Sequence, residues 1–232
     1  MLKDNYFAVE KRVADACERC GRDRSEVTLI AVSKTKPVEM IREVYDLGER
    51  SFGENRPQEL RDKYELLPQD IRWHMIGHLQ KNKIKYVVGR AVMIHSIDSE
   101  DLAEAVSREA VKHGCIMPVL LEVNVAGEDT KFGISPEEAP ALARFVSGLE
   151  GVRVEGLMTI APFVDDPESN RPVFRKLKQL SVDIASENID NVCMNVLSMG
   201  MTNDYEVAIE EGATMVRVGT GIFGERDYSL PV

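Results

Sequence analysis

The stretch LIAVSKTKP, residues 29–37, places two lysines directly after an apolar run. Burying a lysine ammonium is costly, but the pKa of the amine falls when it is desolvated or lies near another cation, and the free amine can then attack an aldehyde to form a Schiff base. Lys34 ends the apolar run and is the stronger candidate for this chemistry. Lys36 is the weaker candidate because it immediately precedes Pro37, where a helix is expected to begin. The alternative interpretation is a strand that simply ends in a solvated lysine.

The rest of the chain alternates short apolar or β-branched runs with longer helical patterns, such as those over residues 99–114 and 171–187. We expect strands over residues 27–33, 50–52, 73–76, 92–96, 119–125, 154–160, 193–198 and 215–219. Strand and helix in repeated alternation predict an α/β fold, a closed (β/α)8 TIM barrel, with an extra N-terminal helix at about residues 4–20 that covers one end. An open doubly wound sheet would usually contain fewer strands and an early glycine-rich turn, and no such turn follows LIAVS.

Polar residues gather where the expected strands end. In a barrel of this kind the active site is built at the carboxyl ends of the strands. Any one of these residues is explained by the exposure of strand ends, but together on one rim they predict a site. They are Lys34, Glu54, Asn55, His78, Ser96, Asn124, Thr159, Ser198, Arg217, Gly219 and Thr220. Arg217 would also lie beside Lys34, because the eighth strand of a closed barrel pairs with the first, and it could be the cation that lowers the pKa of the amine.

The segment RVGTGIFG contains three glycines that fit the G-x-G-x-x-G pattern of dinucleotide-binding folds. Only eight residues follow Gly224, which is too few for the helix, second strand and acidic residue that such a fold needs. Barrels often bind phosphate at the loops after strands seven and eight, where backbone N–H groups can approach an anion. Two interpretations stay open: a phosphate site at these glycines, or a tight C-terminal turn.

Composition limits the classes of function. The 232 residues include 39 acidic and 29 basic side chains, for a formal net charge of -10, so a general nucleic-acid binder is excluded and an anionic ligand needs a local site. No linker divides the chain, and 44% hydrophobic content supports a large core, so we expect one domain over residues 1–232. The charged N-terminus lacks the apolar core of a signal peptide, and the chain contains no stretch of 18 apolar residues that could span a membrane. We therefore expect a cytoplasmic protein.

No metal site is expected. Cys17 and Cys20 form a lone C-x-x-C within a helical pattern, whereas a structural zinc site requires a second pair of ligands. His74 and His78 in HMIGH lack the glutamate and the helical setting of a zinc protease. We therefore expect free cysteines in a reducing compartment.

Five motifs in order, AVSKTKP, FGENRPQE, WHMIGHLQKNK, LSMGMTND and MVRVGTGIFGERDY, resemble those of the pyridoxal phosphate homeostasis proteins (the YggS/PROSC group), which are similar to the barrel domain of alanine racemase. The resemblance runs from about residue 5 to residue 228. It implies that Lys34 carries pyridoxal 5'-phosphate (PLP) as a Schiff base. It also implies that Ser198, Gly219 and Thr220 contact the phosphate, Arg217 the pyridine nitrogen and Asn55 the cofactor, with His78 as a looser assignment.

The sequence departs from the family pattern at a few positions. Arg56 and Pro57 replace the usual GENYVQE sequence, which affects the packing beside Asn55. Thr202 stands where serine is common and retains the hydroxyl, while Gly221 replaces a frequent alanine.

The resemblance leaves two functions to compare. Arginine stays protonated, so Arg217 at the ring nitrogen would keep the pyridine neutral and weaken it as an electron sink. The related racemases add a second, mostly β domain and a partner subunit that supply a tyrosine base, and this chain ends a few residues after the eighth strand. We therefore favour a monomeric PLP-binding protein, not an enzyme, that buffers the cofactor or delivers it to PLP-dependent apoenzymes. A PLP-dependent amino-acid racemase is the alternative, and a cofactor-free Schiff-base aldolase is a third reading.

Overall fold

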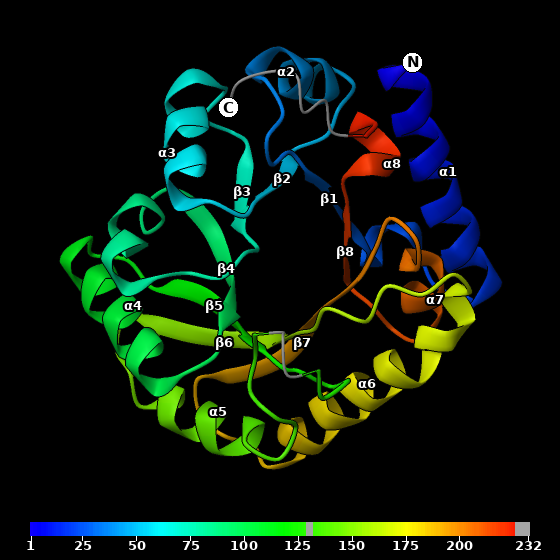
Figure 1. The fold of residues 1–232 in the computed structure, drawn as a ribbon. Helices are drawn as coiled ribbons and strands as arrows, with labels where there is room; N and C mark the ends of the chain where they lie inside the picture. Colours follow the sequence, from blue (N-terminus) through cyan, green and yellow to red (C-terminus); the bar gives the residue numbers. More distant parts are fainter. Residues whose placement is uncertain (129–131, 226–232) are drawn as a thin grey trace.

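Eight parallel strands close into a barrel in the computed structural model, which describes residues 1–128 and 132–225 (Figure 1). The strands are β1 (Thr28–Val32), β2 (Ser51–Glu54), β3 (Arg72–Met75), β4 (Ala91–Ile97), β5 (Met117–Glu122), β6 (Val152–Met158), β7 (Val192–Met201) and β8 (Met215–Val218). Each strand pairs with the next along the chain, and β8 pairs with β1, with Ile30 opposite Arg217. The predicted α/β barrel and its eight strands are therefore confirmed.

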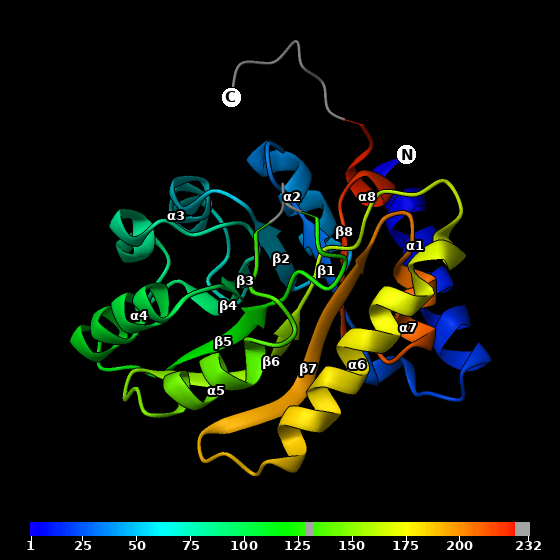
Figure 2. The ribbon, with the colours of Figure 1, turned by 60° about the horizontal axis from the view of Figure 1, so that its bottom comes forward.

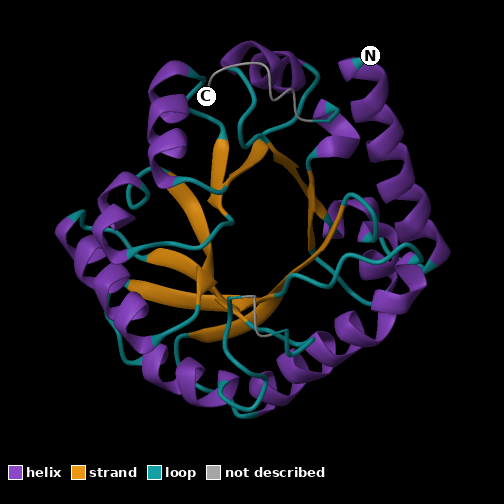
Figure 3. Ribbon diagram, viewed as in Figure 1, coloured by secondary structure: helices purple, strands orange, loops and turns teal. Residues whose placement is uncertain are grey.

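Helices form an outer ring around the strands (Figure 3). They are α1 (Leu2–Arg19), α2 (Val38–Asp46), α3 (Pro57–Leu66), α4 (Glu100–Lys112), α5 (Ala139–Ser147), α6 (Arg171–Ser186), α7 (Tyr205–Glu210) and α8 (Thr220–Phe223). The connection from β3 to β4 differs, because it contains only a 3-10 helix, η2 (Lys81–Tyr86). None of the helices in the described ranges is both long and apolar enough to cross a lipid bilayer.

The N-terminal helix α1 lies on the outer wall of the barrel. The sequence predicted instead that this helix would cover one end of the barrel. Helix α1 packs against α2, α7 and α8, and Figures 1 and 2 both show it beside α7 and α8 on the outside of the barrel. The reason is the length of α8, which makes a single turn and leaves the wall beside β8 and β1 uncovered. The apolar face of α1, which includes Val9 and Val13, buries this wall.

The barrel interior changes from apolar to polar along the strands. A small apolar cluster fills one layer, with Ile30, Met93, Leu120, Met158 and Met215. Toward the carboxyl ends the buried inward-facing side chains include His95, Ser198 and Arg217. His95 on β4 lies 2.9 Å from the Ser198 hydroxyl on β7, and since these strands are not neighbours this contact crosses the interior. The polar layer forms the floor of the site described next.

Candidate cofactor-binding site

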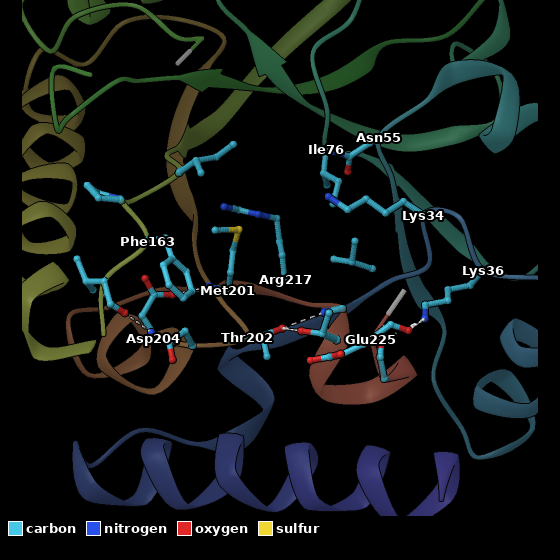
Figure 4. A pocket seen from close by; sticks show the side chains of 18 residues that line it. Lys34, Lys36, Asn55, Ile76, Phe163, Met201, Thr202, Asp204, Arg217 and Glu225 are labelled. Carbon is cyan, nitrogen blue, oxygen red and sulfur yellow. Dashed lines mark hydrogen bonds between the residues drawn. The ribbon is translucent and has the colours of Figure 1, made fainter. Parts of the chain in front are cut away.

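A pocket of about 740 Å³ opens at the carboxyl ends of the strands (Figure 4). Its lining comes from the ends of β1, β2, β3, β6, β7 and β8 and from the loops that follow them. Of the site residues that the sequence predicts, it brings together Lys34, Asn55, Arg217, Gly219 and Thr220. It does not bring in Ser198 or His78.

The two lysines of the first motif have different surroundings. Figure 4 shows the Lys34 side chain extending into the pocket, while that of Lys36 runs toward Glu225. The Lys36 amine donates hydrogen bonds to the carbonyl oxygens of Phe223, Gly224 and Glu225 at 2.9–3.2 Å. Lys36 thus binds the C-terminal end of α8 and holds that short helix beside the turn that carries Lys34. This geometry favours Lys34 as the amine that meets a ligand.

Arg217 supplies a buried cation at the floor of the pocket. Only 4% of the residue is exposed, and its guanidinium donates to the Ser198 hydroxyl at 2.6 Å and to the Thr159 carbonyl at 2.8 Å. Burial lowers the pKa of Arg217 to about 10, while the negative charges of Glu122 and Asp204 oppose this shift. The side chain therefore remains a cation at neutral pH.

A hydrogen-bonded chain continues from Arg217 across the barrel. The Ser198 hydroxyl lies 2.9 Å from Nδ1 of His95, and Nε2 of His95 lies 3.0 Å from Nδ1 of His74. Burial lowers the pKa of His74 to about 3, and burial also lowers the pKa of His95, with further repulsion from His74 and Arg217. Both imidazoles are therefore neutral at pH 7. Among these hydrogen-bonded side chains, Arg217 carries the positive charge.

Ser198 lies beneath the pocket, because β7 continues for three residues beyond the strand end that the sequence predicts. Its hydroxyl is occupied by Arg217 and His95. The rim position falls instead to Thr202, whose Oγ1 accepts a hydrogen bond from the Gly219 N–H at 3.3 Å and lies 3.3 Å from the Thr220 hydroxyl. The hydroxyl and N–H groups at the rim are therefore those of Thr202, Gly219 and Thr220, and an anion there would compete with Thr202 Oγ1 for the Gly219 and Thr220 protons.

His78 lies outside the pocket. Its ring stacks on Phe132 with centroids 4.0 Å apart, and its Nδ1 is 3.5 Å from Asp98, in a separate hollow beside η2 and the start of α4. Ile76, two residues earlier, is the residue that reaches the pocket from β3. Gly77 then packs so closely on the Asn55 backbone that a Cβ atom there would lie 2.6 Å from the Asn55 carbonyl oxygen, and the chain turns away from the rim.

Other polar residues of the rim connect loops and do not line the pocket. Ser96 donates to the Gly77 carbonyl, and Thr159 donates to the Val123 carbonyl. The Asn124 amide binds within its own loop, donating to the Glu128 carbonyl. These side chains fix the backbone from which the pocket-lining residues project.

One wall of the pocket is apolar, and it was not predicted from the sequence. Ile160, Pro162, Phe163 and Val164 follow β6, and Phe163 is 88% exposed. Two asparagines join this loop to the loop after β7: Asn203 donates to the Val164 carbonyl, and Asn170 donates to both the Pro162 carbonyl and Asp204. The signal in the sequence was the apolar APFV at the start of an otherwise polar loop.

Glu122, at the end of β5, carries a buried carboxyl group below the rim. It is 5% exposed, and within the described residues its Oε2 has no hydrogen-bond partner. Burial, together with the negative charge of Asp98, raises the pKa of Glu122 to about 7, while Arg217 acts in the opposite direction. This group therefore holds its proton in the folded state over a pH range in which an exposed glutamate has lost it.

These residues fit a cofactor that carries an aldehyde, an aromatic nitrogen and a phosphate. Lys34 offers an amine, Arg217 a cationic donor, and Thr202, Gly219 and Thr220 a set of hydroxyl and N–H groups beside the first turn of α8. The apolar wall can contact the faces of a ring.

Over nearly its whole length the chain matches a known protein family. Residues 5–227 match the family described as "Alanine racemase, N-terminal domain". The "Pyridoxal phosphate homeostasis protein" of Aquifex aeolicus is 49% identical over 221 residues, which are 95% of this chain and 96% of that protein. This chain belongs to the pyridoxal phosphate homeostasis protein family.

Solved structures extend the comparison. PipY of Synechococcus elongatus PCC7942, solved with PLP bound, superimposes with a TM-score of 0.80 and 36% identity, over 93% of this chain and all of that one. An alanine racemase from Clostridium difficile has a TM-score of 0.75 at 15% identity, over 96% of this chain but 57% of the racemase. The second similarity shows a shared fold alone.

The buried carboxyl of Glu122 gives a pH-dependent prediction for this family member. Between about pH 4.5 and pH 7 the folded protein keeps a proton that the unfolded chain has lost, so the ionisable side chain costs stability as the pH rises. In Glu122→Gln, the free energy of unfolding relative to wild type should therefore increase by roughly 1–3 kcal/mol from pH 5 to pH 8, in urea titrations. The free energy of unfolding of Glu122→Gln should itself still fall somewhat as the pH rises, because burial also raises the pKa of Glu49 and Glu54.

The matched control is Glu65→Gln, since Glu65 is exposed on α3. Its stability curve should run parallel to that of the wild type. A parallel curve for Glu122→Gln as well would show that Glu122 titrates as an ordinary carboxyl group.

Proposed function

We propose that this protein binds pyridoxal 5'-phosphate through Lys34 and holds it for intracellular PLP homeostasis. PLP supplies an aldehyde that condenses with a primary amine, with loss of water, and a conjugated ring that absorbs visible light. The observation that carries the proposal is the arrangement of Lys34, Arg217 and the Thr202–Gly219–Thr220 donors around one pocket. The name of the Aquifex aeolicus relative and the PLP-bound structure of PipY support it.

Several residues of the site would then have specific roles in binding PLP. Thr202, Gly219 and Thr220 would bind the phosphate through hydroxyl and N–H donors, and Arg217 would donate to the pyridine nitrogen. Asn55 would lie beside the cofactor. Ser198 acts from below, because its hydroxyl fixes the guanidinium of Arg217.

Binding is favoured over racemisation for two reasons. Arg217 remains a cation at neutral pH, so a ring nitrogen that accepts its hydrogen bond stays unprotonated and withdraws electrons weakly. Racemisation also requires a second proton-transferring group opposite the lysine. Within the described lining of the pocket no tyrosine, histidine or cysteine is present. Of its two carboxylates, that of Asp204 is bound by the Met201 N–H and Asn170, and that of Glu225 is exposed, on a residue whose carbonyl is held by Lys36.

We also infer the setting in which the protein acts. We expect residues 1–232 to form one PLP-binding domain that works as a monomer in the cytoplasm and passes PLP to PLP-dependent apoenzymes. All four cysteines are free, which agrees with a reducing compartment.

The assignment of Lys34 predicts the site of reductive labelling. Stoichiometric PLP followed by borohydride should place a pyridoxyl group on Lys34, as read by peptide mass spectrometry. Lys36→Met should keep the label on Lys34, because the Lys36 amine is bound to three carbonyl groups of the α8 end. Lys34→Ala should lose it. A wild-type label on Lys36, or an undiminished label in Lys34→Ala, would refute the assignment.

The phosphate site predicts a difference between two ligands. PLP should bind at least about tenfold more tightly than pyridoxal, because each charge-assisted hydrogen bond to the phosphate contributes roughly 1.5–3 kcal/mol. Thr202→Val should weaken PLP binding by about tenfold and leave pyridoxal binding unchanged. Ser198→Ala should weaken both ligands equally, since Ser198 acts through Arg217.

Absorbance titrations of both ligands against each variant measure these affinities. Equal affinity of the wild type for PLP and pyridoxal would contradict the phosphate site. A loss specific to PLP in Ser198→Ala but not in Thr202→Val would return the phosphate contact to Ser198, as the sequence resemblance implies.

A further inference from the structure

A buried cluster of charges lies under the turn that carries Lys34. The amine of Lys63, on α3, donates to Glu54 Oε1 at 2.7 Å, to Glu59 Oε1 at 2.6 Å and to the Ser33 carbonyl at 2.8 Å. The Lys63 side chain is 7% exposed, Glu54 is fully buried, and Glu59 is 16% exposed. None of these three residues lines the pocket.

The cluster holds the residues on both sides of Lys34. Ser33 donates its hydroxyl to Glu54 Oε1 at 2.6 Å, while its carbonyl accepts from Lys63. The backbone N–H of Thr35 donates to Glu59 Oε1 at 2.6 Å. Every one of these contacts passes through Lys63 or through a carboxylate that Lys63 binds.

The turn needs such support because its backbone is strained. Thr35 has φ of +62°, in the left-handed region that a β-branched residue rarely adopts. A strained conformation of this kind persists only where the surrounding structure imposes it. The Thr35–Glu59 hydrogen bond does so here, and the Lys63 ammonium fixes Glu59 in turn.

The charge of the cluster also points to a positioning role. The carboxyl groups of buried Glu54 and partly buried Glu59 share a single ammonium, and burial raises the pKa of Glu54 while Lys63 opposes that shift. Buried ion clusters contribute little net stability compared with apolar side chains of the same size. Their directional hydrogen bonds do fix geometry, and here they fix the two residues that flank Lys34.

We propose that Lys63 is a positioning residue that presents the Lys34 amine to the pocket through Glu54, Glu59 and the Ser33 carbonyl. This inference rests on the proposed function, because it assumes that Lys34 is the amine that reacts with PLP. Without the Lys63 ammonium the Ser33–Thr35 turn loses its anchor, and the amine samples orientations that do not meet the aldehyde.

The test compares Lys63→Met with the wild type in the rate and site of covalent labelling by PLP and borohydride. Labelling of Lys34 in Lys63→Met should slow by about tenfold or more. The matched control is Arg22→Met, which removes a cation that binds the Ile209 and Ala213 carbonyls at the opposite end of the barrel. Arg22→Met should lower the thermal midpoint yet leave the labelling rate within about twofold of wild type.

A second pair of variants tests the positioning role of Lys63 even where Lys63→Met does not fold. Glu59→Gln keeps an oxygen that can accept from Thr35 and Lys63, whereas Glu59→Leu removes it. The labelling rate of Glu59→Gln should stay close to wild type, and that of Glu59→Leu should fall by about tenfold. A role in stability alone would move both rates only as far as it moves the folded fraction, which circular dichroism measures on the same samples.

The outcomes separate the two claims. Absence of a label on Lys34 in the wild type would refute the proposed attachment site itself. A wild-type label with unchanged rates in folded Lys63→Met, or with equal rates in Glu59→Gln and Glu59→Leu, would refute the positioning role of Lys63 and leave the attachment site intact.

Discussion

The pairing of β1 with β8 is the constraint on which the site depends. It sets Ile30 opposite Arg217 and closes the barrel between the first and last strands. Because the paired strands are parallel, the Lys34 turn after β1 and the start of α8 after β8 reach the same rim, although they lie near opposite ends of the sequence. Lys36 strengthens this junction through its three bonds to the end of α8.

The polar layer inside the barrel gives the pocket its electrostatic character. Arg217 is held by a serine hydroxyl and a backbone carbonyl, and within the described residues no carboxylate forms an ion pair with it. The neighbouring imidazoles are neutral because burial lowers their pKa values. A desolvated cation without a direct counter-ion is strongly attracted to an acceptor placed in the pocket, at the cost of burying the charge. We regard this as the physical reason why the floor suits an aromatic nitrogen.

The sequence predicted the barrel and its eight strands, because parallel strands leave apolar runs with polar ends. Five of the predicted site residues, Lys34, Asn55, Arg217, Gly219 and Thr220, line the pocket, whereas its apolar wall was not predicted.

The sequence could not predict how far β7 extends: Ser198, expected at the strand end, lies below the pocket, and Thr202 lines it. His78 was expected at the rim but does not line the pocket, because the chain turns at Gly77, where the backbone packs closely on Asn55. The burial of Lys63 could not be predicted from the sequence, because a lysine on a helix is usually exposed and its burial depends on tertiary contacts.

We infer that the pocket holds PLP without turning over amino acids. The most direct test is to incubate the PLP-loaded protein with individual L-amino acids in deuterated water, and to follow α-deuterium incorporation and chirality by NMR and chiral chromatography. We expect exchange far slower than about 1 per second, close to that of free PLP at the same concentration. Exchange or racemisation at about 1 per second or faster, abolished in Lys34→Ala, would contradict it.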